Sequence, residues 1–236
     1  MLPGDMAGRL AALRAELPPT ARLLAVSKGQ TAAAIREAVA LGQRSFAESR
    51  LQETLAKRAE LADLEPLDWH FIGRLQSNKA RQVLRCFGTI HSLDSVELAE
   101  RLQRIADEES LRPAVLLQVK LLPDPAKTGF EPEALRRLMP RLRQLSPLQI
   151  KGLMTIAPHG LAVGELERLF RACAALAAEL DLAELSMGMS GDWRQAVAAG
   201  STWVRLGRAL FGPRSPRSEQ SGEPTPPGAG VGQSPE

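Results

Sequence analysis

The sequence predicts a single α/β domain, a (β/α)₈ TIM-type barrel with an extra N-terminal helix, and two observations carry this prediction. Short apolar runs alternate with segments of helical periodicity along most of the 236 residues. Eight such runs occur at a regular spacing, and eight βα repeats are what a closed parallel barrel contains. The main alternative is an open doubly wound sheet. We favour the barrel because no glycine-rich dinucleotide fingerprint follows the first apolar run.

The predicted elements follow one another from the N-terminus. A leading helix over about 5–17 ends before Pro18-Pro19, since proline does not continue a helix. Strands are expected at 22–28, 44–48, 68–73, 88–93, 113–120, 149–156, 183–188 and 201–206. Helices are expected between them at 31–41, 51–62, 78–86, 96–108, 132–145, 163–180 and 192–199. The predicted helix N-caps are Thr31, Ser77, Ser95 and Ser190, and glycines close helices at Gly42 and Gly200.

The last part of the chain differs in composition. From Pro213 the sequence is rich in proline, serine and glycine and has no apolar periodicity. Such a segment cannot bury enough apolar surface to fold. We therefore expect a barrel domain over 1–212 and a disordered tail over 213–236.

Composition excludes several classes of function. The 30 basic and 27 acidic residues are spread along the chain and give a net charge of only +3, so nucleic-acid binding is not indicated. No apolar stretch is long enough to span a membrane, and the first residues do not resemble a signal peptide, so we expect a cytoplasmic protein. The two cysteines and three histidines form no known metal-binding spacing, so no metal site is expected. The chain contains no tyrosine, which excludes a phenolic catalytic base.

Lys28 is the first candidate functional residue. It follows the apolar run 23–26 at the point where the first strand should end. Functional residues of a barrel gather at the C-terminal ends of its strands. Desolvation there lowers the pKa of an amine and makes it a better nucleophile toward an aldehyde. The alternative is a lysine that only extends along the surface at a strand end.

Two loops near the C-terminus indicate a phosphate site. Ser190 follows the seventh predicted strand, and Gly207 and Arg208 follow the eighth, where barrels commonly bind phosphate. A strand-end amine together with a phosphate site fits pyridoxal 5′-phosphate, which needs a Schiff base at its aldehyde and an anchor for its phosphate. Arg205, on the last strand, can then face the pyridine nitrogen. The alternative for Arg205 is an ion pair with Asp192 or Glu48.

At these residues the chain resembles the pyridoxal phosphate homeostasis proteins, which have the barrel of bacterial alanine racemase without its second domain. The resemblance covers nearly the whole chain up to Gly212. Its motifs are 25–28, 46–53, 69–79, 91–95, 127–129 and 152–156 together with the two C-terminal loops. One departure is Ser49, which stands where the family has asparagine in Phe-Gly-Glu-Asn. Another is 29–31, where the family usually has a proline.

The resemblance implies a set of cofactor-binding residues and no catalytic residue. Lys28 would form the Schiff base, Arg205 would face the ring nitrogen, and the C-terminal loops would hold the phosphate. The full set of expected cofactor-binding residues is Lys28, Ser49, Ile72, Gly73, Met189, Ser190, Arg205, Gly207 and Arg208.

Three functions remain open from the sequence. The first, which we favour, is a non-catalytic carrier and regulator of pyridoxal phosphate in vitamin B6 and amino-acid homeostasis. The second is a weak amino-acid racemase or lyase that uses Lys28 as its single base, because the missing tyrosine excludes only a two-base scheme. The third is a module that binds apo-enzymes or regulatory proteins and senses the cofactor. We expect a monomer, since the chain lacks the domain with which racemases complete their dimeric sites.

Overall fold

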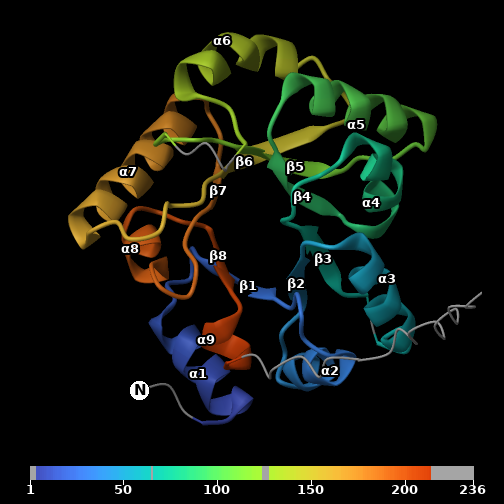
Figure 1. The fold of residues 1–236 in the computed structure, drawn as a ribbon, viewed down its shortest axis with the longest axis vertical. Coiled ribbons are helices and arrows are strands. Elements are labelled where there is room, and N and C mark those ends of the chain that lie inside the picture. The colour runs from blue at the N-terminus through green and yellow to red at the C-terminus, as the bar shows by residue number, and fades with distance from the viewer. Residues whose placement is uncertain (1–3, 65, 124–127, 214–236) are drawn as a thin grey trace, which may run out of the picture.

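The chain folds as a closed barrel of eight parallel strands in the order β1 to β8, with helices on the outside (Figure 1). The structure is a computed structural model and describes residues 4–64, 66–123 and 128–213. Each strand pairs with its neighbours in sequence, and β1 closes the ring against β8 through the pairs Arg22 with Trp203 to Ala25 with Leu206. The predicted barrel is therefore confirmed, and the open sheet is excluded.

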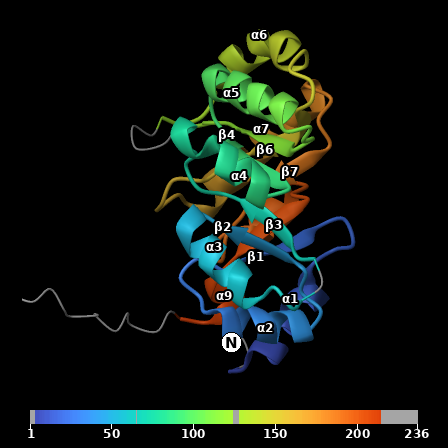
Figure 2. The ribbon, with the colours of Figure 1, turned by 90° about the vertical axis from the view of Figure 1, so that its right-hand side faces the viewer.

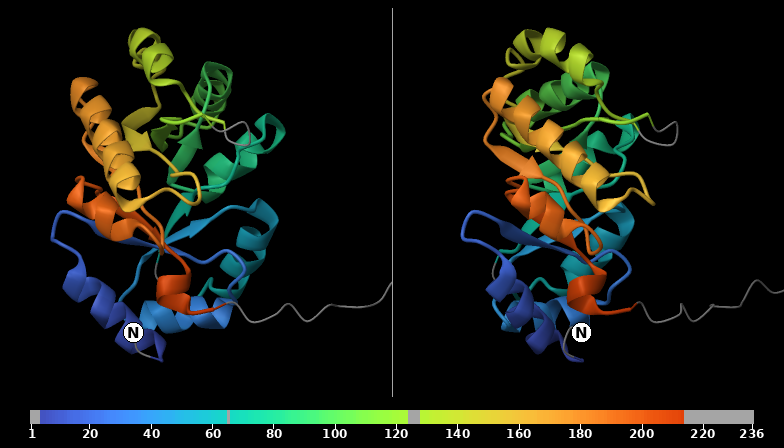
Figure 3. Two further views of the ribbon diagram at one scale, coloured as in Figure 1. Left: turned by 60° about the vertical axis from the view of Figure 1, so that its left-hand side comes forward. Right: turned by 90° about the vertical axis from the view of Figure 1, so that its left-hand side faces the viewer.

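The helices and strands alternate as predicted. The strands are β1 (Arg22–Val26), β2 (Ser45–Glu48), β3 (Asp68–Phe71), β4 (Thr89–Leu93), β5 (Ala114–Gln118), β6 (Gln149–Met154), β7 (Glu184–Ser186) and β8 (Trp203–Leu206). The helices are α1 (Met6–Glu16), α2 (Ala32–Ala40), α3 (Leu51–Glu60), α4 (Ala80–Cys86), α5 (Val96–Glu108), α6 (Pro132–Leu142), α7 (Val163–Glu179), α8 (Trp193–Ala198) and α9 (Arg208–Phe211), and a 3₁₀ turn (Ser77–Lys79) precedes α4. Figure 2 shows α3, α4 and α5 covering one side of the barrel, and Figure 3 shows α7 and α8 on the opposite side.

Two of the predicted N-caps are confirmed and two are wrong. The side chains of Thr31 and Ser95 accept N–H groups at the starts of α2 and α5. Ser77 instead begins the 3₁₀ turn, and α4 starts three residues later. Ser190 does not cap α8, which begins after Asp192, because the Ser190 hydroxyl accepts the N–H of Ala209. The four-residue helix α9 was not predicted, since four residues carry no readable periodicity.

The apolar core has two parts, and alternation along β1 separates them. Leu23 and Ala25 belong to the large cluster between the strands and the helices. Leu24 and Val26 point to the other face and belong to a small cluster with Ala47 and Trp203, against which Ile72 packs. Because successive side chains of a strand point to opposite faces, this small cluster fills the barrel interior. The mouth of the barrel therefore lies directly above Val26 and Ala47.

The N-terminal helix closes the outer layer beside the last helix. α1 and α9 lie side by side in Figures 1 and 3, and Arg9 Nε donates to Leu210 O at 2.7 Å. Among the described helices, none is both long enough and apolar enough to span a membrane. The predicted disordered tail lies outside the described residues, apart from Pro213.

Candidate functional site

Three of the predicted cofactor-binding residues follow three neighbouring strands at the barrel mouth. Val26 is in register with Ala47, and Ala47 with His70. Lys28, Ser49 and Ile72 come two residues after these positions, just beyond the C-terminal ends of β1, β2 and β3. Lys28 is half-buried, as are Ser49 and Ile72. The amine of Lys28 is therefore carried at the C-terminal end of β1, where barrels place functional groups.

A buried ionic cluster holds the turn that carries Lys28. The ammonium group of Lys57 on α3 donates to Ser27 O at 2.8 Å and to the carboxylates of Glu48 and Glu53 at 2.7 Å each. Glu53 also accepts the N–H of Gly29, and the hydroxyl of Ser27 donates to Glu48 at 2.7 Å. The residues on both sides of Lys28 are thus tied to α3. We call Ser27, Glu48, Glu53 and Lys57 the turn cluster.

Within the turn cluster, burial dominates the electrostatics of Glu48. The side chain of Glu48 is 0% exposed and that of Lys57 is 7% exposed. Burial raises the pKa of Glu48, and the hydrogen bonds from Lys57 and Ser27 oppose this shift only in part. One carboxylate oxygen, Oε2 of Glu48, is buried with no hydrogen-bond partner in the described structure. Lys57 is therefore the main group that opposes this rise in the pKa of Glu48.

Gly73 forms the wall beside Ser49. A Cβ atom at Gly73 would lie 2.3 Å from the backbone oxygen of Ser49, which is too close for any side chain. The carbonyl of Gly73 accepts the hydroxyl proton of Ser92 at 2.5 Å. Glycine is therefore required here so that the loops after β2 and β3 can pack against each other.

Arg205 lies on β8 with its side chain inside the barrel, and it is 4% exposed. Its guanidinium donates to the backbone and hydroxyl oxygens of Ser186, the latter at 2.8 Å, and to Thr155 O at 2.8 Å. Burial lowers the pKa of Arg205 to about 10. Within the described residues it forms no ion pair. The predicted alternative, an ion pair of Arg205 with Asp192 or Glu48, is wrong. Glu48 pairs with Lys57, and Asp192 accepts the N–H of Met189.

A continuous chain of hydrogen bonds leads from Arg205 through the barrel to its N-terminal end. Ser186 Oγ contacts His91 Nδ1 at 2.8 Å, and His91 Nε2 contacts His70 Nδ1 at 2.8 Å. His70 Nε2 contacts Asp68 Oδ2 at 2.6 Å, and the side chain of Asp68 is 47% exposed. We call these five residues the interior chain. Of these five residues, only Arg205 is predicted from the sequence as a site residue, because the contacts between strands far apart in the sequence need the closed barrel.

The contacts of the interior chain fix Arg205 in the barrel. A guanidinium only donates, so the hydroxyl oxygen of Ser186 accepts from Arg205. Burial is the main cause that lowers the pKa of His91 well below its ordinary value, and the charge of Arg205 adds to this shift. The contact of His91 with Ser186 therefore helps to position Arg205.

The two predicted phosphate loops meet at the barrel mouth. Ser190, after β7, accepts the N–H of Ala209 in α9, after β8, at 3.2 Å. The oxygen of Ser190 is the acceptor in this bond, so its own proton can be donated to an anion. A Cβ atom at Gly207 would lie 3.3 Å from Val26 O, so the second loop lies against the end of β1. This brings Ser190, Gly207 and Arg208 to the strand that carries Lys28.

The remaining predicted residue, Met189, is half-buried between Gly188 and Ser190, and its N–H donates to Asp192.

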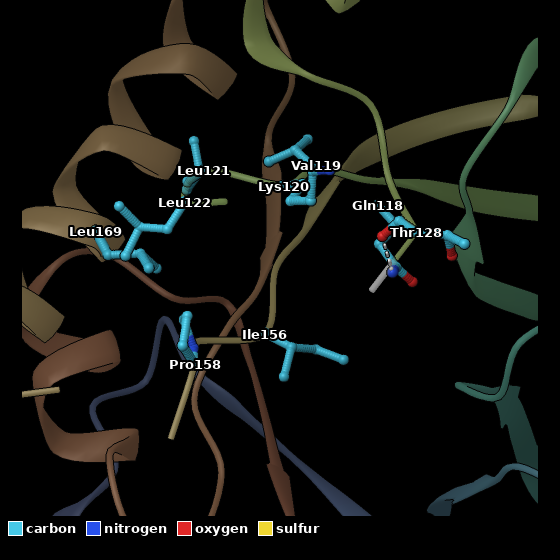
Figure 4. Close-up of a pocket in the computed structure, with 9 residues that line it drawn as sticks. All are labelled: Gln118, Val119, Lys120, Leu121, Leu122, Thr128, Ile156, Pro158 and Leu169. Atoms are coloured by element: carbon cyan, nitrogen blue, oxygen red, sulfur yellow. Dashed lines mark hydrogen bonds between the residues drawn. The ribbon is translucent and has the colours of Figure 1, made fainter. Parts of the chain in front are cut away.

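A small cavity lies at the ends of β5 and β6 (Figure 4). It holds about 10 Å³, enough for one water, and Gln118 Nε2 donates to Thr128 O at 2.6 Å on its wall. In the described part of the chain no group of histidine, cysteine and acidic residues could hold a metal ion.

The residues around the candidate site that are not predicted from sequence are Asp68, His70, His91 and Ser186 of the interior chain and the turn cluster. Only the pair of Glu53 and Lys57 has a recognisable sequence pattern. Glu53 and Lys57 are four residues apart on a predicted helix, which is the spacing of an intrahelical ion pair. The other contacts join strands or loops that are distant in sequence.

Comparisons with known proteins agree with this architecture. The family model described as alanine racemase, N-terminal domain, matches residues 4–215. A protein from Synechocystis sp. named pyridoxal phosphate homeostasis protein is 50% identical over 206 residues, which cover 85% of this chain and 94% of the relative. A protein of the same name from Escherichia coli K12 is 40% identical over 84% of this chain and 87% of the relative.

Solved structures match this chain at high and at low sequence identity. PipY of Synechococcus elongatus, solved with PLP bound, is 55% identical with a TM-score of 0.85, covering 88% of this chain and 100% of that chain. Alanine racemase from Bartonella henselae is 18% identical with a TM-score of 0.72, covering 89% of this chain and 58% of that chain. The racemase shows the shared fold alone.

Proposed function

Because this chain belongs to the family of pyridoxal phosphate homeostasis proteins, we propose that it binds pyridoxal 5′-phosphate as an aldimine of Lys28 and acts as a non-catalytic carrier and regulator in vitamin B6 and amino-acid homeostasis. The observation that carries the proposal is that three groups lie on or just after β1, β7 and β8, which neighbour one another in the closed barrel. These are the half-buried amine of Lys28, the buried guanidinium of Arg205 and the joined loops at Ser190 and Ala209. We further propose that the protein acts in the cytoplasm as a monomer and that apo-enzymes or regulatory proteins receive the cofactor.

The chemistry of the donor set fits this cofactor. When bound, pyridoxal phosphate supplies an aldehyde that condenses with a primary amine and a ring that withdraws electrons. Lys28 is a primary amine held by the turn cluster, which fixes the backbone on both sides of it. Ser190 offers a hydroxyl proton, and the short helix α9 after β8 lies where barrels bind phosphate. Ser49, Ile72, Gly73 and Met189 complete the proposed wall.

Arg205 favours a carrier over an enzyme. A guanidinium can donate to the ring nitrogen but cannot accept its proton at neutral pH, so the ring stays unprotonated and is a weak electron sink. The interior chain holds Arg205 in place, because its guanidinium donates to the hydroxyl of Ser186, which in turn contacts His91. The absence of tyrosine from the chain removes the second base of a two-base racemase. Both features work against carbanion chemistry.

The experiment compares transfer with turnover. Purified protein loaded with pyridoxal phosphate is mixed with an apo-enzyme that needs the cofactor, and the recovery of that enzyme's activity is followed. The same loaded protein is incubated with L-alanine or L-serine, and the enantiomers are separated. We expect the apo-enzyme to be reactivated and racemisation to be no faster than with free cofactor. Racemisation that exceeds the free-cofactor rate and is lost in Lys28→Ala would support the weak single-base enzyme instead.

A further inference from the structure

A second pocket opens beside the cofactor mouth, between the loops that follow β2 and β3. Its volume is about 310 Å³, at the lower end of the range for small-molecule sites. Phe71, Leu75 and Val83 are buried and give it an apolar floor. Ser49 lines it on the side of the mouth. The pocket thus has the size and the floor for a small organic ligand.

The rim of this pocket is basic. Arg50, Arg74 and Lys79 all line it. Within the described residues none of these three side chains takes part in an ion pair, whereas arginines on the outer helices do, as in Arg36 with Asp63 and Arg194 with Glu16. Three cations around one cavity repel one another unless an anion lies between them.

The acidic residue Glu53 offsets only part of this charge. Glu53 lines the pocket and interacts electrostatically with Arg50, but its carboxylate is already bonded to Lys57 and to the N–H of Gly29. The first turn of α3, a helix of 10 residues, also faces the pocket, and no side chain caps its N-terminus at Arg50. The N–H groups of this turn add to the positive potential of the rim.

We propose that this pocket binds a small organic phosphate monoester with a flat or apolar body, as a site separate from that of Lys28. The phosphate would lie among Arg50, Arg74 and Lys79, and the body would lie on Phe71, Leu75 and Val83. Arginine and lysine bind phosphate through charge-assisted hydrogen bonds. Lys28 does not line this pocket, so ligand binding here does not depend on the proposed function.

The test uses protein whose mouth is already filled, by treatment with pyridoxal phosphate and then borohydride. This protein is titrated in a calorimeter with pyridoxine 5′-phosphate, which has no aldehyde, with pyridoxine, which has no phosphate, and with glucose 6-phosphate, which has no aromatic ring. If the chain takes up no pyridoxal phosphate at all, the same titrations are run on Lys28→Ala, so that failure of the proposed function is seen separately.

The variants are the double change Arg50→Gln and Arg74→Gln, and the single change Arg104→Gln as a control. Arg104 is also exposed and forms no ion pair within the described residues, but it lies on α5 away from the pocket. Because the two changed arginines are exposed, the fold should survive, and circular dichroism checks this. Lys79→Met provides an independent removal of one rim charge.

We expect saturable binding of one equivalent of pyridoxine 5′-phosphate, about tenfold or more weaker in the double variant and unchanged in Arg104→Gln. Lys79→Met should also weaken it, and added salt should weaken it in the wild type. Pyridoxine should bind about tenfold or more weakly. No saturable binding, or equal binding by wild type and the double variant, would overturn the proposal. If glucose 6-phosphate bound as tightly as pyridoxine 5′-phosphate, the proposal that the ligand has a flat or apolar body would be overturned.

Discussion

Replacing Lys57 with methionine should destabilise the protein strongly, because Lys57 is the only cation that contacts Glu48 among the described residues. Its ammonium group makes three hydrogen bonds of 2.7 to 2.8 Å, and the carboxylate of Glu48 is fully buried. Methionine keeps the length of the side chain but leaves the carboxylate with Ser27 alone. Breaking a buried ion pair by removing one partner costs about 3–5 kcal/mol.

The loss should also depend on pH. Burial raises the pKa of Glu48 above its value in the unfolded chain, and Lys57 opposes this shift. Without Lys57 the folded-state pKa rises further, so the folded protein binds a proton more tightly than the unfolded chain does. The variant therefore loses stability as pH rises through the window above about 4.5, the ordinary pKa of a glutamate. The difference from wild type should be larger at pH 8 than at pH 5.

Urea unfolding at both pH values measures this effect, and the rate at which borohydride traps pyridoxal phosphate on Lys28 measures its consequence at the site. Lys151→Met is the control, because Lys151 is exposed on β6. Adding Glu48→Gln to the Lys57 variant should restore part of the stability, since it removes the unpaired charge. A loss below about 1 kcal/mol at pH 8, together with an unchanged trapping rate, would refute the role assigned to the turn cluster.

Three further predictions concern Arg205, Gly73 and His91. Arg205→Gln removes the cation beneath the mouth, so the cofactor should dissociate about tenfold or more faster in dialysis, and equal retention would place Arg205 outside the binding site. Gly73→Ala should lower the free energy of unfolding by about 1–3 kcal/mol, because its Cβ meets Ser49 O at 2.3 Å, whereas Gly88→Ala, with open space around it, should change little. Because the pKa of His91 is lowered on folding, the unfolded chain binds the extra proton, and stability should fall by up to about 1.4 kcal/mol per pH unit below the ordinary pKa of about 6.5. His91→Asn should flatten this slope in urea titrations at pH 5, 6 and 7, and an unchanged slope would mean that His91 is not neutral in the fold.

The barrel could be predicted from sequence because its strands and helices are marked locally. Each strand is a short apolar run, and α5 was placed at its observed bounds because Val96 to Glu108 has strong helical periodicity after a serine cap. Strand ends were predicted up to two residues too long, as for β1, since the register of neighbouring strands decides where pairing stops. Local patterns carry no record of that register.

The candidate site was predictable only in part. Lys28 and the two loops could be identified because each lies at the end of a strand, and the barrel brings all strand ends together. The partners of Arg205 could not be identified, because Ser186 lies on β7 and Thr155 lies just after β6, and both contribute through backbone oxygens. The sequence places Glu48 among the predicted partners of Arg205. Its side chain instead faces α3, since it follows Phe46 on the outward face of β2.

The measurement that tests the central claim most directly is the absorption spectrum of the purified protein with pyridoxal phosphate, followed by borohydride reduction and peptide mass mapping. The account predicts a visible absorption band of a protonated Schiff base and a pyridoxyl group on Lys28 after reduction. Lys28→Ala should lose both signals while keeping the circular dichroism spectrum of the wild type. A protein that shows no band and no modified peptide with added cofactor would contradict the account, as would a pyridoxyl group on another lysine with Lys28 unmodified.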